Sequence, residues 1–171
     1  MDTGTVQLLH VLQASLSPDA STRQQAEAAL EAGARQPGFA TALLSVVLAP
    51  EVAPSIRQLA AVVLKKLIKE HWTFEAPAFR EPPIGEQEKA HLREIIPTGL
   101  ADPNSVLRTA VAMVVANIAK WDCPQAWPAL IPRCQGLRGS GTPGLAPVDG
   151  RWWHLTWASQ CRSCRPLSVC C

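Results

Sequence analysis

The strongest helical pattern of the chain runs over residues 54–72, PSIRQLAAVVLKKLIKEHW. Its apolar residues recur at steps of three and four, which places them on one face of a helix. The members of this stripe are Ile56, Leu59, Ala60, Val63, Leu64, Leu67 and Ile68. Pro54 suits the first helical position, where its missing N–H costs nothing. We therefore predict a helix with this stripe in the core, ended by the prolines that begin at Pro77.

The opposite face of this predicted helix carries small or basic residues. They are Gln58, Ala61, Val62, Lys65, Lys66 and Lys69. Small side chains let a partner approach closely, and lysines attract an acidic surface. An ordinary solvated face with weak helix support is the alternative interpretation. We expect this face to be exposed and to be the main candidate for binding another protein.

Five further helices are predicted, at about residues 5–17, 20–35, 39–48, 86–100 and 105–120. Proline-containing turns separate most of them. In the first helix we expect Val6, Leu9, Leu12 and Leu16 to face inward, and in the second Ala26, Ala29 and Leu30. In the last helix the expected inward residues are Leu107, Ala110, Val111, Val114 and Ile118. No alternation of period two competes with this pattern, so the fold class is predicted to be all-α.

A weak internal repeat links three of these helices. Arg23, Arg57 and Arg108 each follow a proline-containing turn at the start of a helix, 34 and 51 residues apart. These intervals bracket the period of about 40–47 residues that is typical of some two-helix solenoid repeats. We expect the arginines to be scaffold residues that bond neighbouring repeats, and the six helices to form three pairs.

The composition favours a helical domain and gives little support to catalysis. The 171 residues are 47% hydrophobic and 18% charged, with no tyrosine. Neither a membrane-length apolar run nor a signal-peptide pattern is present in the sequence. The four histidines are scattered, and neither a G-x-S-x-G elbow nor a glycine-rich phosphate loop occurs. We expect a cytosolic protein that is not an enzyme and binds no cofactor.

Two blocks of sequence resemble one known family. The first is IRQLAAVVLKKLIKEHW, residues 56–72, and the second is WDCPQAWPALIP, residues 121–132. The second matches a W-D-x-P-x-x-W-P-x-L pattern that joins the third and fourth repeats of importin-β-type nuclear transport receptors. Both blocks are similar to the N-terminal part of that family, and most closely to its importin-9 branch. The resemblance covers roughly residues 5–134.

The resemblance implies a superhelix of HEAT repeats, with about three repeats and part of a fourth in this chain. Members of the family bind the GTP form of the GTPase Ran through the second helices of their first repeats. The family's Leu-Lys-polar pattern is met by Leu64-Lys65-Lys66, so Lys65 is the first candidate contact. Lys66, Lys69 and Lys120 follow, beside Gln58, Ala61 and Val62, while Trp121 and Trp127 are expected to pack between repeats.

Further expectations follow from the same resemblance. Cargo should bind through repeats beyond those in this chain, and the protein should be found in cytoplasm and nucleus. A HEAT-repeat scaffold for another protein complex, without Ran binding, is the alternative function.

The sequence changes character after residue 134. Residues 1–134 hold 12 Lys or Arg against 13 Asp or Glu, whereas residues 135–171 hold 4 Arg and one Asp. We therefore predict a HEAT-repeat domain over 1–134 and a disordered tail over 135–171 that is unrelated to the family. Zinc ligands could come from His154, Cys161, Cys164, Cys170 and Cys171, but only one C-x-x-C pair is present. We expect neither a metal site nor nucleic-acid or membrane binding there.

Overall fold

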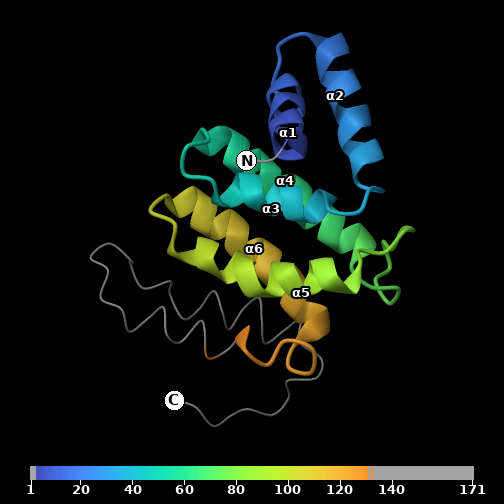
Figure 1. The fold of residues 1–171 in the computed structure, drawn as a ribbon, viewed down its shortest axis with the longest axis vertical. Helices are drawn as coiled ribbons and strands as arrows, with labels where there is room; N and C mark the ends of the chain where they lie inside the picture. The colour runs from blue at the N-terminus through green and yellow to red at the C-terminus, as the bar shows by residue number, and fades with distance from the viewer. Residues whose placement is uncertain (1–2, 131, 133–171) are drawn as a thin grey trace. The chain divides into compact units, whose positions relative to one another are not determined.

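The computed structural model describes residues 3–130 and 132, and every regular element in this part is a helix (Figure 1). The order is α1 (Thr3–Ala14), α2 (Ala20–Gly33), α3 (Phe39–Leu48), α4 (Pro54–His71), α5 (Glu86–Ile95), the 3-10 helix η1 (Ile96–Ala101) and α6 (Ser105–Asp122). The all-α prediction is confirmed, and α3 has the predicted bounds.

Residue contacts divide the chain into two compact units, 1–115 and 116–171. The first unit holds α1 to α5, η1 and the first part of α6, through Val115. The second begins at Ala116, within α6. The predicted boundary after residue 134 and the predicted tail lie outside the described residues, and so do the alternative zinc ligands.

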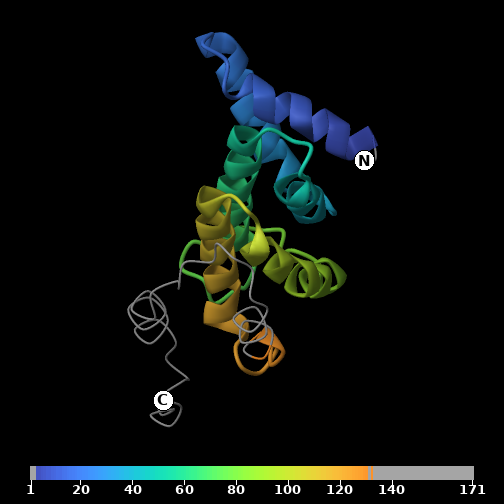
Figure 2. The same cartoon turned by 90° about the vertical axis from the view of Figure 1, so that its left-hand side faces the viewer.

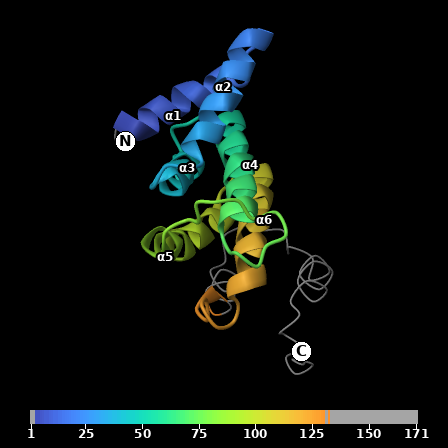
Figure 3. The same cartoon turned by 90° about the vertical axis from the view of Figure 1, so that its right-hand side faces the viewer.

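Within the first unit the helices form two layers. Figures 2 and 3 both show α1, α3 and α5 in one layer, with α2, α4 and the first part of α6 in the other. Helix α3 packs against α4, α1 and α5, and α1 also packs against α2 and α4. Successive helices thus alternate between layers, which is the arrangement expected for a stack of HEAT repeats.

Helix α3 is the centre of the core in this unit. Its sequence FATALLSVVL is apolar almost all round, and a helix of that kind must be covered on most sides. Leu43, Leu44, Val46 and Val47 are each at most 1% exposed. Full burial of such a side chain contributes about 1.5–3 kcal/mol. The short helix is therefore held by its packing, because ten residues alone form only a marginal helix.

The predicted inward face of α1 is only partly right. Leu12 is fully buried, but Val6 is 43% exposed and Leu16 is 52% exposed. Thr5 and Leu8 are buried in their place. Two adjacent leucines, at 8 and 9, make two overlapping stripes possible, and packing against α2, α3 and α4 selects the one through Leu8.

Helix α2 departs from its predicted face in a similar way. Ala26 is buried as predicted, and Leu30 is half-buried. The predicted inward residue Ala29 is exposed. An alanine adds little apolar area, so the pattern of this alanine-rich helix fixes its orientation weakly.

The predicted helix over 86–100 is divided. Helix α5 ends at Ile95, and η1 continues to Ala101 with Pro97 in its first turn. Proline has no N–H and disfavours α-geometry in the residue before it, so the α-helix cannot continue regularly.

Gly99 of η1 lies where a Cβ atom would be 2.9 Å from Leu48 Cδ2 and 3.0 Å from Val111 Cγ2. The backbone of η1 can approach α3 and α6 closely because this residue has no side chain.

The N-terminal ends of α2 and α3 are each capped by a carboxylate that accepts hydrogen bonds from backbone N–H groups. Asp19 precedes α2, and its Oδ2 accepts hydrogen bonds from Thr22 N at 2.7 Å and Ser21 Oγ at 2.6 Å. These bonds, led by that from Ser21, lower the pKa of Asp19 from 3.8 to about 2. For α3 the carboxylate comes from α5, since Glu88 accepts from Gly38 N at 3.1 Å and Thr41 N at 2.9 Å. Both carboxylates satisfy N–H groups that have no partner within the helix.

The cap of α2 predicts a pH-dependent stability. Because the pKa of Asp19 is lower in the folded chain, its contribution is complete above the unfolded value of 3.8 and is lost as pH falls toward about 2. Asp19→Ala should lower the unfolding midpoint in urea at about pH 5. The difference from wild type should shrink at about pH 2.5, where the wild-type carboxylate is partly protonated.

Two further variants make this measurement specific. Asp19→Asn keeps a side-chain acceptor and should be intermediate at about pH 5. Glu27→Gln removes another exposed acid of α2 and should leave the midpoint nearly unchanged. A constant difference between wild type and Asp19→Ala across this pH range would contradict the role given to Asp19.

Candidate functional site

A buried arginine fixes the start of α4. Arg57 is 7% exposed, and its Nε donates to the carbonyl oxygen of Val47 in α3 at 2.8 Å. Its Nη2 forms an ion pair with the carboxylate of Asp102, whose side chain is 9% exposed. One guanidinium therefore connects α3, α4 and the turn before α6.

The turn before α6 is organised around the same aspartate. Asp102 Oδ1 accepts from Asn104 N at 2.8 Å, and Asn104 Oδ1 accepts from Val106 N at 2.9 Å. Arg108 Nη1 donates to the carbonyl oxygen of Asp102 at 2.8 Å. These bonds fix where α6 begins, so the starts of α4 and α6 are held in a defined relation within the first unit.

A hollow of about 290 Å³ lies between α4 and the first part of α6. Figures 2 and 3 both show these two segments side by side in one layer. Helix α4 supplies one wall and α6 the other. The lining residues are Gln58, Ala61, Val62 and Lys65 from α4, and Val106, Thr109, Ala110 and Met113 from α6.

The surface around this hollow is apolar and positively charged. Val62, Val106 and Met113 are 47%, 49% and 48% exposed. Neither residues 54–69 nor residues 105–115 contain an acidic residue. Among the described residues, neither Lys65 nor Lys69 has an acidic partner within 4.0 Å. Their charge is therefore available to a partner molecule.

The structure brings together most, but not all, of the predicted contact residues on α4. Gln58, Val62 and Lys65 line the hollow, and Lys69 is exposed one turn after Lys65. Ala61 was predicted to be exposed, and this is wrong, because it is 1% exposed at the base of the hollow. The buried face of α4 is rotated relative to the predicted stripe, since Arg57 and Ala61 are buried whereas the predicted core residues Leu59 and Val63 are only half-buried.

Two other predicted lysines differ in their surroundings. Lys66 Nζ lies 3.7 Å from Glu31 Oε1 of α2, an exposed pair that contributes little to stability. Lys120 is in the last turn of α6 and belongs to the second unit, where its Nζ lies 4.8 Å from the centroid of the Trp121 ring. Their contact with a partner stays a prediction.

The three repeating arginines do not share one role. Arg57 crosses from α4 to α3 and to the turn before α6, as expected of a residue that bonds neighbouring repeats. Arg23 instead donates to the carbonyl oxygens of Ser17 and Pro18, at 2.9 and 2.8 Å. Arg108 binds Asp102 and Pro103 in the same way. These two arginines close the turns before their own helices.

The two tryptophans predicted as packing residues belong to the second unit. Trp127 is 4% exposed, its N donates to the carbonyl oxygen of Asp122 at 2.9 Å, and its own carbonyl accepts from Cys123 Sγ at 3.5 Å. Trp121 is half-buried. Packing of either ring between repeats stays a prediction.

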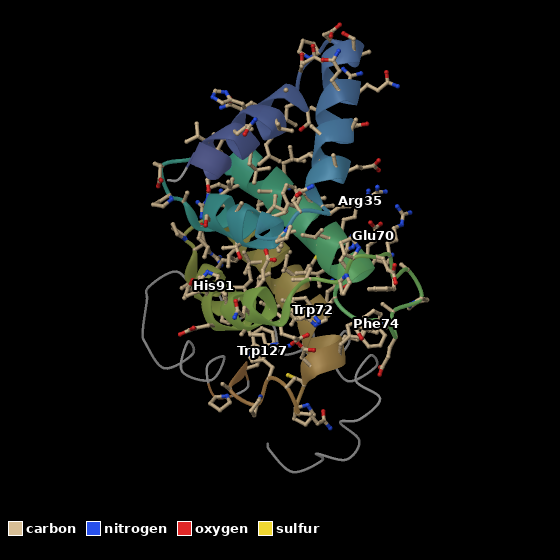
Figure 4. The ribbon with its side chains drawn as sticks, turned by 45° about the vertical axis from the view of Figure 1, so that its right-hand side comes forward. Arg35, Glu70, Trp72, Phe74, His91 and Trp127 are labelled. Carbon is tan, nitrogen blue, oxygen red and sulfur yellow. The ribbon has the colours of Figure 1, made fainter. Side chains whose placement is uncertain are left out.

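Sequence reasoning missed the α6 wall of the hollow and the burial of Trp72. Val106 and Met113 lie seven residues apart on the face of α6 away from its core stripe, which is a weak signal for the wall. Ala110, predicted to face inward, is only half-buried and lines the hollow. Trp72 (Figure 4) is 1% exposed. Lys89 Nζ lies 5.6 Å and Arg93 Cζ 5.4 Å from the centroid of its ring. Both distances fit cation–π contacts.

Other sites receive less support. A hollow of about 580 Å³ lies beside the α2–α3 turn, but Glu88 on its wall already binds the N–H groups of α3. Over residues 3–130 and 132, no three His, Cys, Asp or Glu side chains are grouped to hold a metal ion. In the same range no helix has the length and apolar character to cross a membrane.

The two-layer stack of helix pairs is that of a HEAT-repeat protein. Similarity to known protein sequences specifies the class. Residues 26–102 match the importin-beta N-terminal domain. Human importin-11 is 31% identical over 132 residues, which cover 77% of this chain and 13% of that relative. Importin-9 of Drosophila melanogaster is 32% identical over 147 residues, 82% of this chain and 14% of the relative. The chain belongs to the importin-β family.

A third relative shows how widely the similarity extends within the family. Transportin of Dictyostelium discoideum is 31% identical over 153 residues, which cover 90% of this chain and 15% of the relative. Together these alignments span 13–15% of the length of the curated relatives. Identities to importin-11 and importin-9 are nearly equal, so the importin-9 branch stays a prediction.

The buried ion pair between Arg57 and Asp102 predicts that a single substitution lowers the stability of the fold strongly. Arg57→Met leaves the carboxylate of Asp102 buried without its counterion, which typically costs about 3 kcal/mol or more. Urea unfolding of the purified chain should show this loss in the free energy of unfolding.

Matched variants test whether the pair itself is responsible. Arg23→Met removes an arginine that binds only its own turn and should cost clearly less. Arg57→Met combined with Asp102→Ala should cost less than the sum of the two single variants, because the two residues interact directly. If the losses of unfolding free energy in the two single variants simply add up in the double variant, Arg57 and Asp102 do not stabilise each other.

Proposed function

We propose that this chain forms the Ran-binding part of a nuclear transport receptor. The GTP form of Ran binds over the outer face of α4, with Lys65 as the central contact. Gln58, Val62 and Lys69 belong to the same surface, and Ala61 forms its base. Lys66 and Lys120 are secondary contacts.

One observation carries the proposal. Lys65 stands at the edge of an apolar hollow, on a face that lacks acidic residues, and it occupies the position that fits the family's Leu-Lys-polar pattern. Membership of the importin-β family gives this surface a partner class. An acidic surface on the partner would be steered to the lysines, and apolar contacts would form in the hollow.

The rest of the proposed function concerns the whole receptor. The relatives extend far beyond the segment matched here, and we assign cargo binding to that remaining length. A receptor of this kind is present in cytoplasm and nucleus, has no catalytic role and needs no cofactor. The names of the relatives, importins and a transportin, support transport over the alternative of a scaffold without Ran.

Charge reversal on α4 tests the proposal. Lys65→Glu combined with Lys69→Glu should weaken binding of GTP-loaded Ran at least tenfold, because like charges then face each other across the interface. The loss should be larger at low ionic strength, since these lysines are accessible to solvent and are screened by salt. Titration calorimetry with GTP- and GDP-loaded Ran gives the affinities.

A control with added negative charge separates a local contact from the effect of net charge. Gln24→Glu combined with Gln25→Glu adds two negative charges at exposed positions of α2 that do not line the hollow, and should change the affinity little. Equal wild-type affinity for the two nucleotide forms would refute the proposal. So would equal losses in the two double variants.

A further inference from the structure

We propose that the hollow between α4 and α6 seats an apolar side chain of an acidic amphipathic helix, and that α6 supplies half of this seat. The inference rests on the proposed function, because it concerns the same surface. To the surface of α4 it adds a second wall on α6, formed by Val106, Thr109 and Met113. It also specifies the chemistry of the protein segment that binds there.

The size and lining of the hollow fit a side chain. Its volume is about 290 Å³, at the lower end of the roughly 300–1,000 Å³ of small-molecule pockets. Val62, Val106 and Met113 are each about half exposed around it, while Ala61 forms a buried base. An apolar side chain placed here would remove exposed apolar area on both walls from water.

The charges around the hollow select an acidic segment. Arg57 is paired with Asp102, Arg108 donates to backbone carbonyls, and Lys66 lies 3.7 Å from Glu31 in an exposed pair. In the part of the chain that the structure describes, Lys65 and Lys69 have no such acidic neighbour, and they are spaced one helical turn apart. Two carboxylates spaced one turn apart on a docking helix would face them directly.

The arrangement of the walls favours a helix as the docking element. Helix α4 and the first part of α6 lie side by side, so the space between them is bounded by two helical walls (Figures 2 and 3). Amphipathic helices bind in such grooves through apolar anchors at steps of three and four residues. The anchor enters the hollow, and carboxylates one turn away meet the lysines.

A second copy of this chain fits the surface poorly. A symmetric dimer would place the same patch on both sides of the interface. Lys65 and Lys69 would then face the same lysines of the partner copy, and like-charge contacts of this kind are unfavourable. The charge of the surface thus favours a different, acidic protein.

Filling the hollow tests the inference without changing charge. Thr109 is exposed on the α6 wall, so Thr109→Trp should fold and occupy the seat. Gln24→Trp, at an exposed position of α2, is the matched control. The probe is a synthetic helical peptide with leucines at steps of three and four and glutamates one turn away. Thr109→Trp should weaken its binding at least tenfold in fluorescence anisotropy, whereas Gln24→Trp should bind like wild type.

Two peptide variants test the two parts of the chemistry. Replacing the leucines with serine should abolish binding, because the apolar anchor is lost. Replacing the glutamates with lysine should also abolish binding to wild type and restore it to the Lys65→Glu, Lys69→Glu variant. Failure of the acidic peptide to bind, or equal binding of the serine peptide, would overturn the inference.

The same variants separate this inference from the proposed function. If GTP-loaded Ran does not bind but the peptide binds in a manner sensitive to Thr109→Trp, the proposed function fails and the seat remains. If Ran binds and Thr109→Trp changes neither its affinity nor that of the peptide, the Ran surface remains and the seat is refuted. If Thr109→Trp loses binding of both Ran and the peptide while Gln24→Trp keeps both, the proposed function and the seat are both supported.

Discussion

The contact of Arg57 with Asp102 and Val47 is the constraint on which the first unit depends. A charged pair that is nearly buried loses hydration, so it persists only where geometry and further hydrogen bonds compensate. Here the guanidinium also binds a carbonyl of α3, and Asp102 also accepts from the turn before α6. The starts of α4 and α6 are held together in this way. The hollow between these helices exists because their spacing is fixed near that point.

Helix α4 has one face that packs in the core and another that is available for binding. Its core stripe lies against α3, the most completely buried helix, while Gln58, Val62 and Lys65 face the hollow. A side chain on the second face contributes little to stability, so its chemistry is free to serve recognition. The half-exposed apolar residues and lysines without acidic partners are therefore more informative about function than the core is.

The surface combines two kinds of attraction with different ranges. Lysine charges act over about a Debye length and orient an approaching acidic partner. The apolar seat acts only on contact, through the area it removes from water. A protein surface of opposite charge can use both kinds of attraction. Family membership agrees with this conclusion from physical chemistry.

The sequence alone determined where most of the helices lie and that Lys65, Lys66 and Lys69 fall outside the core stripe of α4, but not that the helix predicted over 86–100 ends at Ile95. Periodicity and prolines placed α3 and α4 almost to the residue, because these signals act within one turn of the chain. It did not determine which stripe of α1 is buried, since Leu8 and Leu9 allow two, nor that Ala61 lies beneath the surface. The meeting of α4 and α6 at one hollow, and the Arg57–Asp102 pair, 45 residues apart in sequence, were also decided only by the tertiary structure. A helical pattern fixes the angle of a residue about its own axis, but the neighbour that covers it is set by packing between helices.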